Sequence, residues 1–318
     1  MSVTEIDWQA PWLQGFGHHG QAVLDLWRSL NSLPGALNQY ALNVGIRLDS
    51  RNGVNLEPAS EGVNLAEGDK VTGPVDGLPF FVAQECLPEG LAYESFIYKT
   101  HRVPTRENLH DFFNALCWIR FPRTKSFLNA QQASAITHLG HVNSRGALRD
   151  ALTLLDENAC FVWCDELLWR ALRAHDWKSA FGAHRDQWAH ARVELFGHAL
   201  LEKLCNPYKA ITAHALRVGS SEAAPVPRWG EDESLRPHAE QTQRQSQSQS
   251  QSLACPLSDG ELDRAILSTL QAVSLREKPF QALPVLGIPG WCEDNRSPSF
   301  YEDGRVFRPR RDQAPQSS

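Results

Sequence analysis

The sequence predicts an α+β fold that is predominantly helical, with the helices packed around a small antiparallel sheet. Most segments carry apolar residues three and four positions apart, the spacing of a helix. Two short aromatic and β-branched stretches, PFFVAQ from Pro79 and YESFIYK from Tyr93, are separated by a connection containing Pro and Gly. This pattern is typical of neighbouring antiparallel strands. The chain is 42% hydrophobic and 21% charged, as in ordinary globular domains. We therefore expect a single domain, with an irregular C-terminal segment packed back on it.

The first helices are predicted from their apolar spacing and from the residues that begin and end them. One helix runs from near Gln21 to the Pro34–Gly35 pair, which is expected to end it. Another begins behind Pro104, with Thr105 as its N-cap, and stops at Pro122, after which a further helix begins.

The later elements follow the same reasoning. Ser144 is a candidate cap, Asn206–Pro207 is a candidate helix start, and Ser258 with Glu261 has the spacing of a capping box. The run at 160–164 is either a strand or an apolar turn, since periodicity does not separate the two. Helices are expected in RGALRDALTLLDE, DELLWRALRAHDW, RDQWAHARVELFGHALLEKL, YKAITAHALRV and SDGELDRAILSTLQAV.

Composition divides the chain into four parts. Residues 1–218 form the main helical body with its sheet, and residues 257–309 complete the same domain with a helix and an irregular segment. Between them, 219–256 is polar and ends in four Gln-Ser dipeptides. Such a tract buries too little apolar area to offset its ordering entropy, so we expect a disordered insert there and a disordered tail at 310–318.

The totals favour a cytoplasmic protein. Seven cysteines in irregular positions suit reduced thiols, and neither a secretory signal nor a run long enough to cross a membrane is visible. A net charge of −6 argues against a generic nucleic-acid coat. The sequence contains no Gly-x-Gly-x-x-Gly, phosphate-loop or Gly-x-Ser-x-Gly motif, so it names no cofactor.

The best candidate site is a polar row on the helix that precedes Pro122. Glu107, His110, Asp111 and Asn114 fall on one face at helical spacing. His110, Asp111 and Asn114 are the candidate catalytic residues, because a histidine beside carboxylate and amide groups can do acid–base chemistry or bind a metal. The alternative is the ordinary solvated face of an amphipathic helix.

The same region is a basic island in an acidic protein. Residues 99–125 contain six Lys or Arg against two Asp or Glu. Its candidate anion-binding residues are Arg106, Arg120, Arg123 and Lys125, which could hold a phosphate or carboxylate. The alternative is that these side chains pair with carboxylates elsewhere in the chain.

Two looser patterns also involve histidine. An HNH-type nuclease arrangement would use His101, Asn108, His110 and Asn114, but the histidine doublet expected of such nucleases is absent.

The other pattern is a ladder with four-residue spacing. It resembles part of a di-metal helix site, although i,i+4 pairing along a long helix is the simpler explanation. The ladder consists of Asp186, His190, Glu194, His198 and Glu202.

Several segments resemble one protein family. PTRENLHDFFNALCWIRFPRTKSFLNAQQ, DALTLLDEN, FGHALLEKL with PYKAITAHA, and LPVLGIPGW with FYEDGRVFRPRR resemble the uncharacterised bacterial domain-of-unknown-function family 3025 over most of residues 70–310. The resemblance implies no established activity, cofactor or catalytic residue. From the residues themselves, the first hypothesis is a hydrolase-like enzyme acting on an anionic or phosphate-bearing substrate. The alternative is a non-catalytic module that binds nucleic acid or protein through the 99–125 region, with no role at a membrane.

Overall fold

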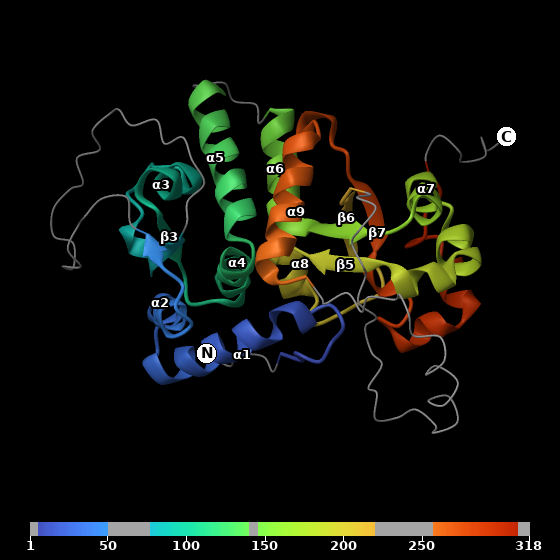
Figure 1. Cartoon of the computed structure of the whole chain (residues 1–318), viewed down its shortest axis with the longest axis horizontal. Helices are drawn as coiled ribbons and strands as arrows, with labels where there is room; N and C mark the ends of the chain where they lie inside the picture. The colour runs from blue at the N-terminus through green and yellow to red at the C-terminus, as the bar shows by residue number, and fades with distance from the viewer. Residues whose placement is uncertain (1–5, 50–76, 140–145, 220–256, 311–318) are drawn as a thin grey trace, which may run out of the picture.

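Helices make up most of the described residues, and a small sheet lies on each side of a central group of helices (Figure 1). The structure is a computed structural model that describes residues 6–49, 77–139, 146–219 and 257–310. Its longer helices are α1 Gln14–Leu30, α2 Leu33–Asn43, α3 Tyr93–Thr100, α4 Leu109–Arg120, α5 Pro122–Leu139, α6 Ala147–Asn158, α7 Glu166–Ala174, α8 His198–Lys203 and α9 Asp259–Ala272. Its strands are β1 Leu48–Asp49, β2 Leu78–Ala83, β3 Arg102–Thr105, β4 Ala159–Trp163, β5 Arg192–Leu195, β6 Thr212–Arg217 and β7 Gln281–Pro284.

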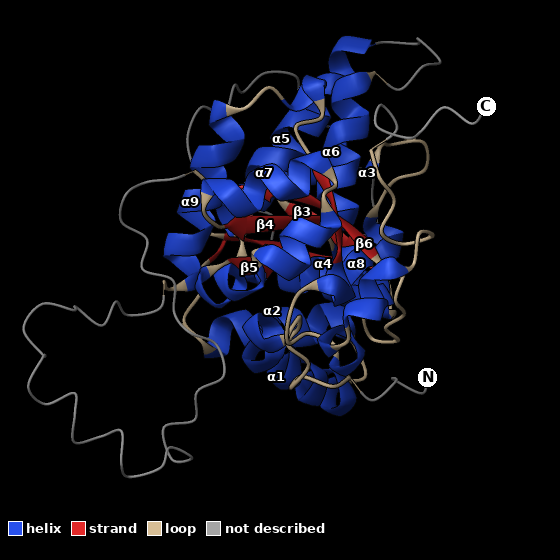
Figure 2. Cartoon of the chain, turned by 90° about the vertical axis from the view of Figure 1, so that its right-hand side faces the viewer, coloured by secondary structure: helices blue, strands red, loops and turns tan. Residues whose placement is uncertain are grey.

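The expectation of an antiparallel sheet is wrong. The first sheet, in the order β1-β2-β3, is parallel throughout. The second, in the order β5-β4-β6-β7, is mixed, because β4 and β6 are parallel while both outer pairs are antiparallel. Strands β4, β5 and β6 lie in the middle of the molecule, with helices above and below them (Figure 2).

The segment YESFIYK explains the error in the first sheet. It is helix α3, which buries Phe96, Ile97 and Thr100 on one face. Parallel neighbours such as β2 and β3 need a crossover connection between them, and α3 provides it. In a segment of eight residues, the aromatic and β-branched content alone does not distinguish a strand from a helix.

The expectation of one long helix in RDQWAHARVELFGHALLEKL is also wrong. The segment forms a 3-10 helix at Arg185–His190, then strand β5 and then helix α8. Arg192 Nε donates to Glu194 Oε1 at 2.7 Å, a pairing across two residues that a strand allows on one face. The turn into α8 passes so close to α6 that a Cβ at Gly197 would lie 2.4 Å from the Asn158 backbone nitrogen.

Other element predictions have mixed outcomes. The run at 160–164 contains strand β4, whereas YKAITAHALRV contains strand β6 in place of a helix. Helix α9 has the predicted capping box between Ser258 and Glu261. Helix α4 is capped by Asn108 rather than by Thr105, which lies in β3.

The remaining boundaries concern helices α1, α2 and α5. Pro122 is the first residue of α5, where a proline without an N–H is well tolerated. Pro34–Gly35 lies in the first turn of α2, while α1 ends at Asn31 in a left-handed conformation.

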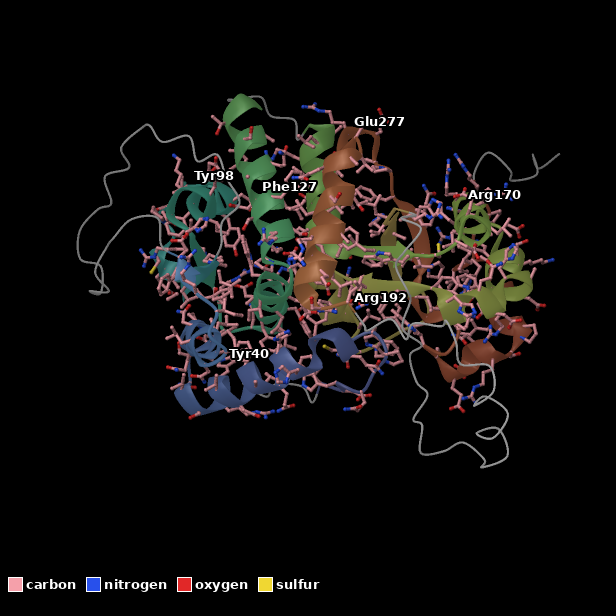
Figure 3. The ribbon with its side chains drawn as sticks, in the orientation of Figure 1. Tyr40, Tyr98, Phe127, Arg170, Arg192 and Glu277 are labelled. Atoms are coloured by element: carbon pink, nitrogen blue, oxygen red, sulfur yellow. The ribbon has the colours of Figure 1, made fainter. Side chains whose placement is uncertain are left out.

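One continuous apolar core runs through the described residues and includes the C-terminal segment. Phe300 and Phe307 are buried, and the Phe307 ring lies 5.8 Å from that of Phe181. On the helical side, Phe127 of α5 packs against the same core (Figure 3). No described helix has the length and apolarity needed to cross a membrane. Ser144, most of the expected insert (220–256) and the tail 311–318 lie outside the described residues.

Candidate metal centre

The polar row predicted at the start of α4 separates into two groups with different surroundings. Glu107 accepts hydrogen bonds from Trp27 Nε1 at 2.6 Å and from the Leu33 backbone N–H at 2.9 Å, so it satisfies the N-terminus of α2. Asp111 accepts from the Arg106 backbone N–H at 2.6 Å and from Arg106 Nη2 at 2.8 Å. Both carboxylates therefore fasten the chain around the start of α4.

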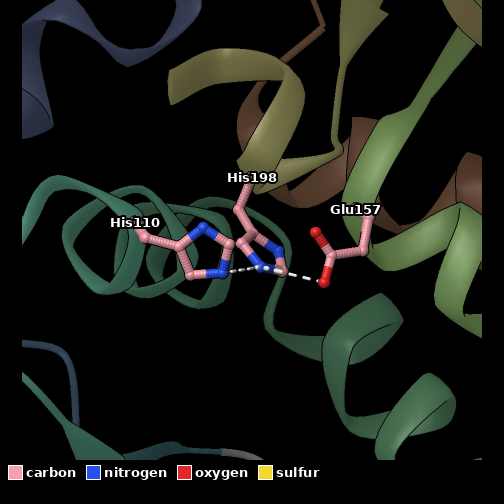
Figure 4. Close-up of side chains that lie close together, drawn as sticks. All are labelled: His110, Glu157 and His198. Atoms are coloured by element: carbon pink, nitrogen blue, oxygen red, sulfur yellow. Dashed lines mark hydrogen bonds and ion pairs between the residues drawn. The ribbon is translucent and has the colours of Figure 1, made fainter. Parts of the chain in front are cut away.

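His110 faces in another direction, towards α8. Asn108 caps α4 by accepting from the Asp111 N–H at 2.8 Å, which places His110 in the first turn. The His110 Nδ1 atom lies 2.9 Å from Glu202 Oε2, and its Nε2 atom lies 3.0 Å from His198 Nε2. The two rings lie edge to face (Figure 4). Their centroids are 4.5 Å apart.

Glu157 completes a three-residue cluster. His198 is the first residue of α8, and Glu157 lies one residue before the end of α6. The His198 Nε2 atom is 3.9 Å from Glu157 Oε1 (Figure 4). One ligand atom each from His110, Glu157 and His198 lie within 4.8 Å of one another. Two imidazole nitrogens and a carboxylate oxygen form a donor set that suits divalent transition metals.

A second carboxylate stands behind each imidazole. Glu202 contacts His110 Nδ1, and Asp156 Oδ2 lies 3.6 Å from His198 Nδ1. A carboxylate on the far nitrogen of a metal-bound histidine is the usual means of orienting the ring and fixing its tautomer. The cluster therefore has both the inner donors and the outer partners of a metal centre.

Asp156 is in turn held by a buried lysine. The Lys125 ammonium contacts Asp156 Oδ1 and donates to Asn114 Oδ1 at 2.8 Å, while Asn114 Nδ2 donates to Tyr93 Oη at 3.2 Å. Burial alone would raise the pKa of Asp156, but the Lys125 charge holds it below its ordinary value. Asp156 is therefore ionised at neutral pH, and its Oδ2 atom faces the Nδ1 atom of His198.

Burial dominates the electrostatics of His198. Its side chain is only 6% exposed, and burial lowers its pKa to about 4 although Asp156 acts in the opposite direction. The ring is therefore neutral at physiological pH, with a proton on one nitrogen only. Its Nδ1 atom is buried and makes no hydrogen bond among the described residues.

The predicted anion-binding side chains are engaged within the protein. Arg120 is 3% exposed and lies 2.7 Å from Glu194 and 3.0 Å from Asp259. Lys125 pairs with Asp156, and Arg106 pairs with Asp111, as described above.

Arg123 contributes a main-chain contact to this region. Its backbone N–H donates to Asp263 Oδ2 at 2.8 Å. The geometry of the basic island thus supports internal pairing, the alternative considered from the sequence.

The structure also separates the residues of the nuclease arrangement and of the four-residue ladder. In the nuclease arrangement, Asn108 serves as a helix cap and His101 ends α3 in a left-handed conformation. In the ladder, His198 and Glu202 reach the metal centre. Asp186 and His190 lie on the 3-10 helix, and Glu194 lies in β5.

Sequence reasoning did not single out Asp156 and Glu157. They close a helix in the stretch LLDEN, where acidic residues are common, and no local spacing links them to His110. The only available signal was the Glu202–His198 pair, four residues apart, which α8 does present on one face.

The region that holds this centre matches a known family. A family model described as "Protein of unknown function (DUF3025)" matches residues 80–311. The chain belongs to the DUF3025 family. No curated protein and no solved structure has significant similarity to this DUF3025 chain. The three residues of the candidate metal centre and its two outer carboxylates lie inside the matched region, whereas helices α1 and α2 precede it.

Proposed function

We propose that His110, His198 and Glu157 bind a divalent transition-metal ion, with Zn²⁺ as the first candidate, and that the protein is a metal-dependent hydrolase. His110 and Glu157 are each about one-third exposed, at 33% and 37%, so one side of the cluster opens to solvent. Three protein ligands with an open side are typical of catalytic rather than structural zinc sites.

The converging donor set of two imidazole nitrogens and a carboxylate oxygen carries the proposal, and the proton inventory of the two imidazoles supports it. If His110 is neutral and its Nδ1 donates to Glu202, its Nε2 is unprotonated, and the 3.0 Å contact requires a proton on Nε2 of His198. The Nδ1 lone pair of neutral His198 would then face the ionised Asp156, which is unfavourable. The opposite tautomers place the same conflict at Glu202.

An extra positive charge at this contact, either a proton or a metal ion held by both Nε2 atoms, would remove this conflict. With a metal ion, both Nε2 lone pairs point at the ion, and both Nδ1 atoms carry protons that Glu202 and Asp156 accept. Zn–N bonds of about 2.0–2.1 Å place two ligand nitrogens roughly 3.3 Å apart. The observed Nε2–Nε2 distance of 3.0 Å is slightly shorter than this separation.

A bound divalent ion supplies a water of lowered pKa and polarises a substrate oxygen. Around it, Glu202 and Asp156 set the orientation of the two rings, and Lys125 keeps Asp156 ionised. The solvent side next to His110 and Glu157 is where a substrate would approach. Because the nearby basic side chains neutralise carboxylates of the chain itself, this hydrolase has no built-in requirement for an anionic substrate.

The test is metal binding and turnover by the full chain after removal of metal with a chelator. We expect one Zn²⁺ per chain by calorimetric titration, and a loss of roughly a hundredfold or more in affinity in His110→Ala and His198→Ala. His190→Ala is the matched control, because His190 is exposed and lies outside the cluster. Equal Zn²⁺ affinity in the wild type and both ligand variants would refute the site.

Turnover separates the enzyme from a structural metal protein. Zinc-loaded protein is expected to hydrolyse p-nitrophenyl acetate or bis(p-nitrophenyl) phosphate, and the chelated protein and His198→Ala are expected to lose that activity. Tight Zn²⁺ binding without hydrolysis of either ester would retain the metal site and reject the hydrolase.

A further inference from the structure

The free edge of the four-stranded sheet forms the floor of a cavity that is separate from the metal centre. Strand β5 is the outermost strand of this sheet, and Arg192 marks its start (Figure 3). A cavity of about 640 Å³ lies along β5, between the start of α1 and the turn at 288–291. Such a volume is in the range of ligand sites.

The ladder between β4 and β5 shows which backbone groups face this cavity. The Phe196 N–H donates to Ala159 O, and these two residues are paired by the register that joins Leu195 to Cys160. In an antiparallel ladder, hydrogen-bonded pairs alternate with non-bonded pairs. Residues 192, 194 and 196 therefore bond to β4, while Val193 and Leu195 direct their N–H and C=O groups outward.

Both outward-facing residues line the cavity, and outside the strand ladders no backbone–backbone hydrogen bond joins either one to another described residue. Leu195 is only 3% exposed. Unpaired main-chain groups in such a position are unfavourable, and they form a template for another strand. The backbone of an extended peptide would satisfy the outward-facing N–H and C=O groups of this edge.

The cavity walls combine aromatic rings with charged residues that balance in sign, Arg120 and Arg185 against Asp186 and Glu194. Trp12 and Trp291 lie with their ring centres 6.4 Å apart, and Trp188 lines the wall near the start of β5. The buried Arg120–Glu194 pair is internally neutral. These walls suit apolar side chains, because aromatic rings offer large contact areas without a demand for charge.

We propose that the β5 edge binds an extended, uncharged segment of a partner protein as an added strand, with apolar side chains at alternate positions against the tryptophans. Main-chain bonds to the partly exposed Val193 supply the register, and side-chain contacts with the walls supply selectivity. This binding role is independent of the metal centre.

The test uses the full chain and a fluorescein-labelled heptapeptide of alternating threonine and valine. Fluorescence polarisation is expected to saturate for the wild type. An otherwise identical peptide N-methylated at alternate residues is expected to bind at least tenfold more weakly, as is a peptide of alternating aspartate and valine.

Val193→Pro is the informative variant. It removes only an N–H that points into the cavity, and proline is tolerated at such edge positions. Val193→Thr keeps the N–H at nearly the same volume and serves as the control. Binding within twofold of the wild type by Val193→Thr, with at least a tenfold loss in Val193→Pro, would support the proposal.

Three results would overturn it. The first is no saturable binding of the heptapeptide to the wild type, and the second is equal binding by Val193→Pro. The third is slow hydrogen exchange of the Val193 and Leu195 amides in the free protein, which would show that the edge is already paired. The N-methylated peptide keeps the test decisive should Val193→Pro fail to fold.

Discussion

A methyl group added at Gly15 should destabilise the protein strongly. The ideal Cβ at this position would lie 2.3 Å from Arg120 Nη1, 2.4 Å from Cζ and 2.5 Å from Nη2. Ordinary contacts of carbon with these atoms begin about 1 Å further out. Gly15→Ala therefore requires the whole guanidinium group to move, and Arg120 is 3% exposed and bonded to Glu194 and Asp259.

The expected loss of stability follows from the ion pairs that are broken when the Arg120 guanidinium moves. Breaking a buried ion pair by removing one partner costs about 3–5 kcal/mol. Replacing glycine by alanine within a helix returns at most about 1 kcal/mol. We expect the free energy of unfolding to fall by about 2–4 kcal/mol, with a decrease in Tm of roughly 4–16 °C for a chain of this size.

Urea titration followed by tryptophan fluorescence measures this change. Gly17→Ala is the matched control in the same helix, because its Cβ would meet Trp8 at an ordinary 3.5 Å. It should leave stability unchanged or raise it by up to about 1 kcal/mol. In an Arg120→Met background, Gly15→Ala should lose most of its cost. A loss of less than about 1 kcal/mol in the otherwise wild-type chain would contradict this account of Arg120.

Two further predictions concern carboxylates. Glu202→Gln, which keeps an acceptor for His110 but removes the charge, should weaken Zn²⁺ binding by roughly 10–100-fold in a chelator competition assay. Glu293→Gln, a change at an 85% exposed side chain, should have no effect, and equal affinities in both variants would count against an outer role for Glu202. Burial and then Asp156 raise the pKa of Glu94 from 4.5 to about 7, so the folded state holds a proton that the unfolded state releases in that range. The stability that this proton contributes is present below pH 4.5 and is lost as the pH rises to about 7. We expect a decrease of about 1–2 kcal/mol once screening of the partly exposed side chain is allowed for. Urea titrations across this range should show the decrease in the wild type and a flatter profile in Glu94→Gln, and parallel profiles would be inconsistent with titration of Glu94.

Long amphipathic elements could be predicted because their signals are local. Helix α7 has its cap at Asp165 and its apolar stripe within nine residues, and α9 has a capping box at its start. The short elements could not be predicted in the same way. The segments Tyr93–Thr100 and Thr212–Arg217 have similar lengths, yet one is a helix and the other a strand. Their neighbours in space determine the outcome, since the parallel β2–β3 and β4–β6 pairs connect distant parts of the chain.

The candidate site likewise contains one residue that could be selected from the sequence and others that could not. His110 could be selected from its place in a polar row, but Glu107 and Asp111 have the same pattern on a helical wheel. Their partners distinguish them: Trp27 and Leu33 for Glu107, Arg106 for Asp111, and His198 for His110. The His110–His198 contact spans 88 positions of sequence, a distance at which periodicity carries no information. The roles of these residues in chemistry stay predictions.

The contact of Glu107 with Trp27 and Leu33 has a consequence for the boundaries of the folding unit. The family match begins at residue 80, but the first turn of α2 is capped from residue 107, within the matched region. Gly15 likewise covers Arg120 from outside that region. A fragment trimmed to residues 80–311 would leave the Glu107 carboxylate without its Trp27 and Leu33 donors at the start of α4, and would expose the buried Arg120 guanidinium at its end. The N-terminal hairpin of α1 and α2 is therefore an integral wall of the helix that carries His110, and its loss would loosen that helix at both ends.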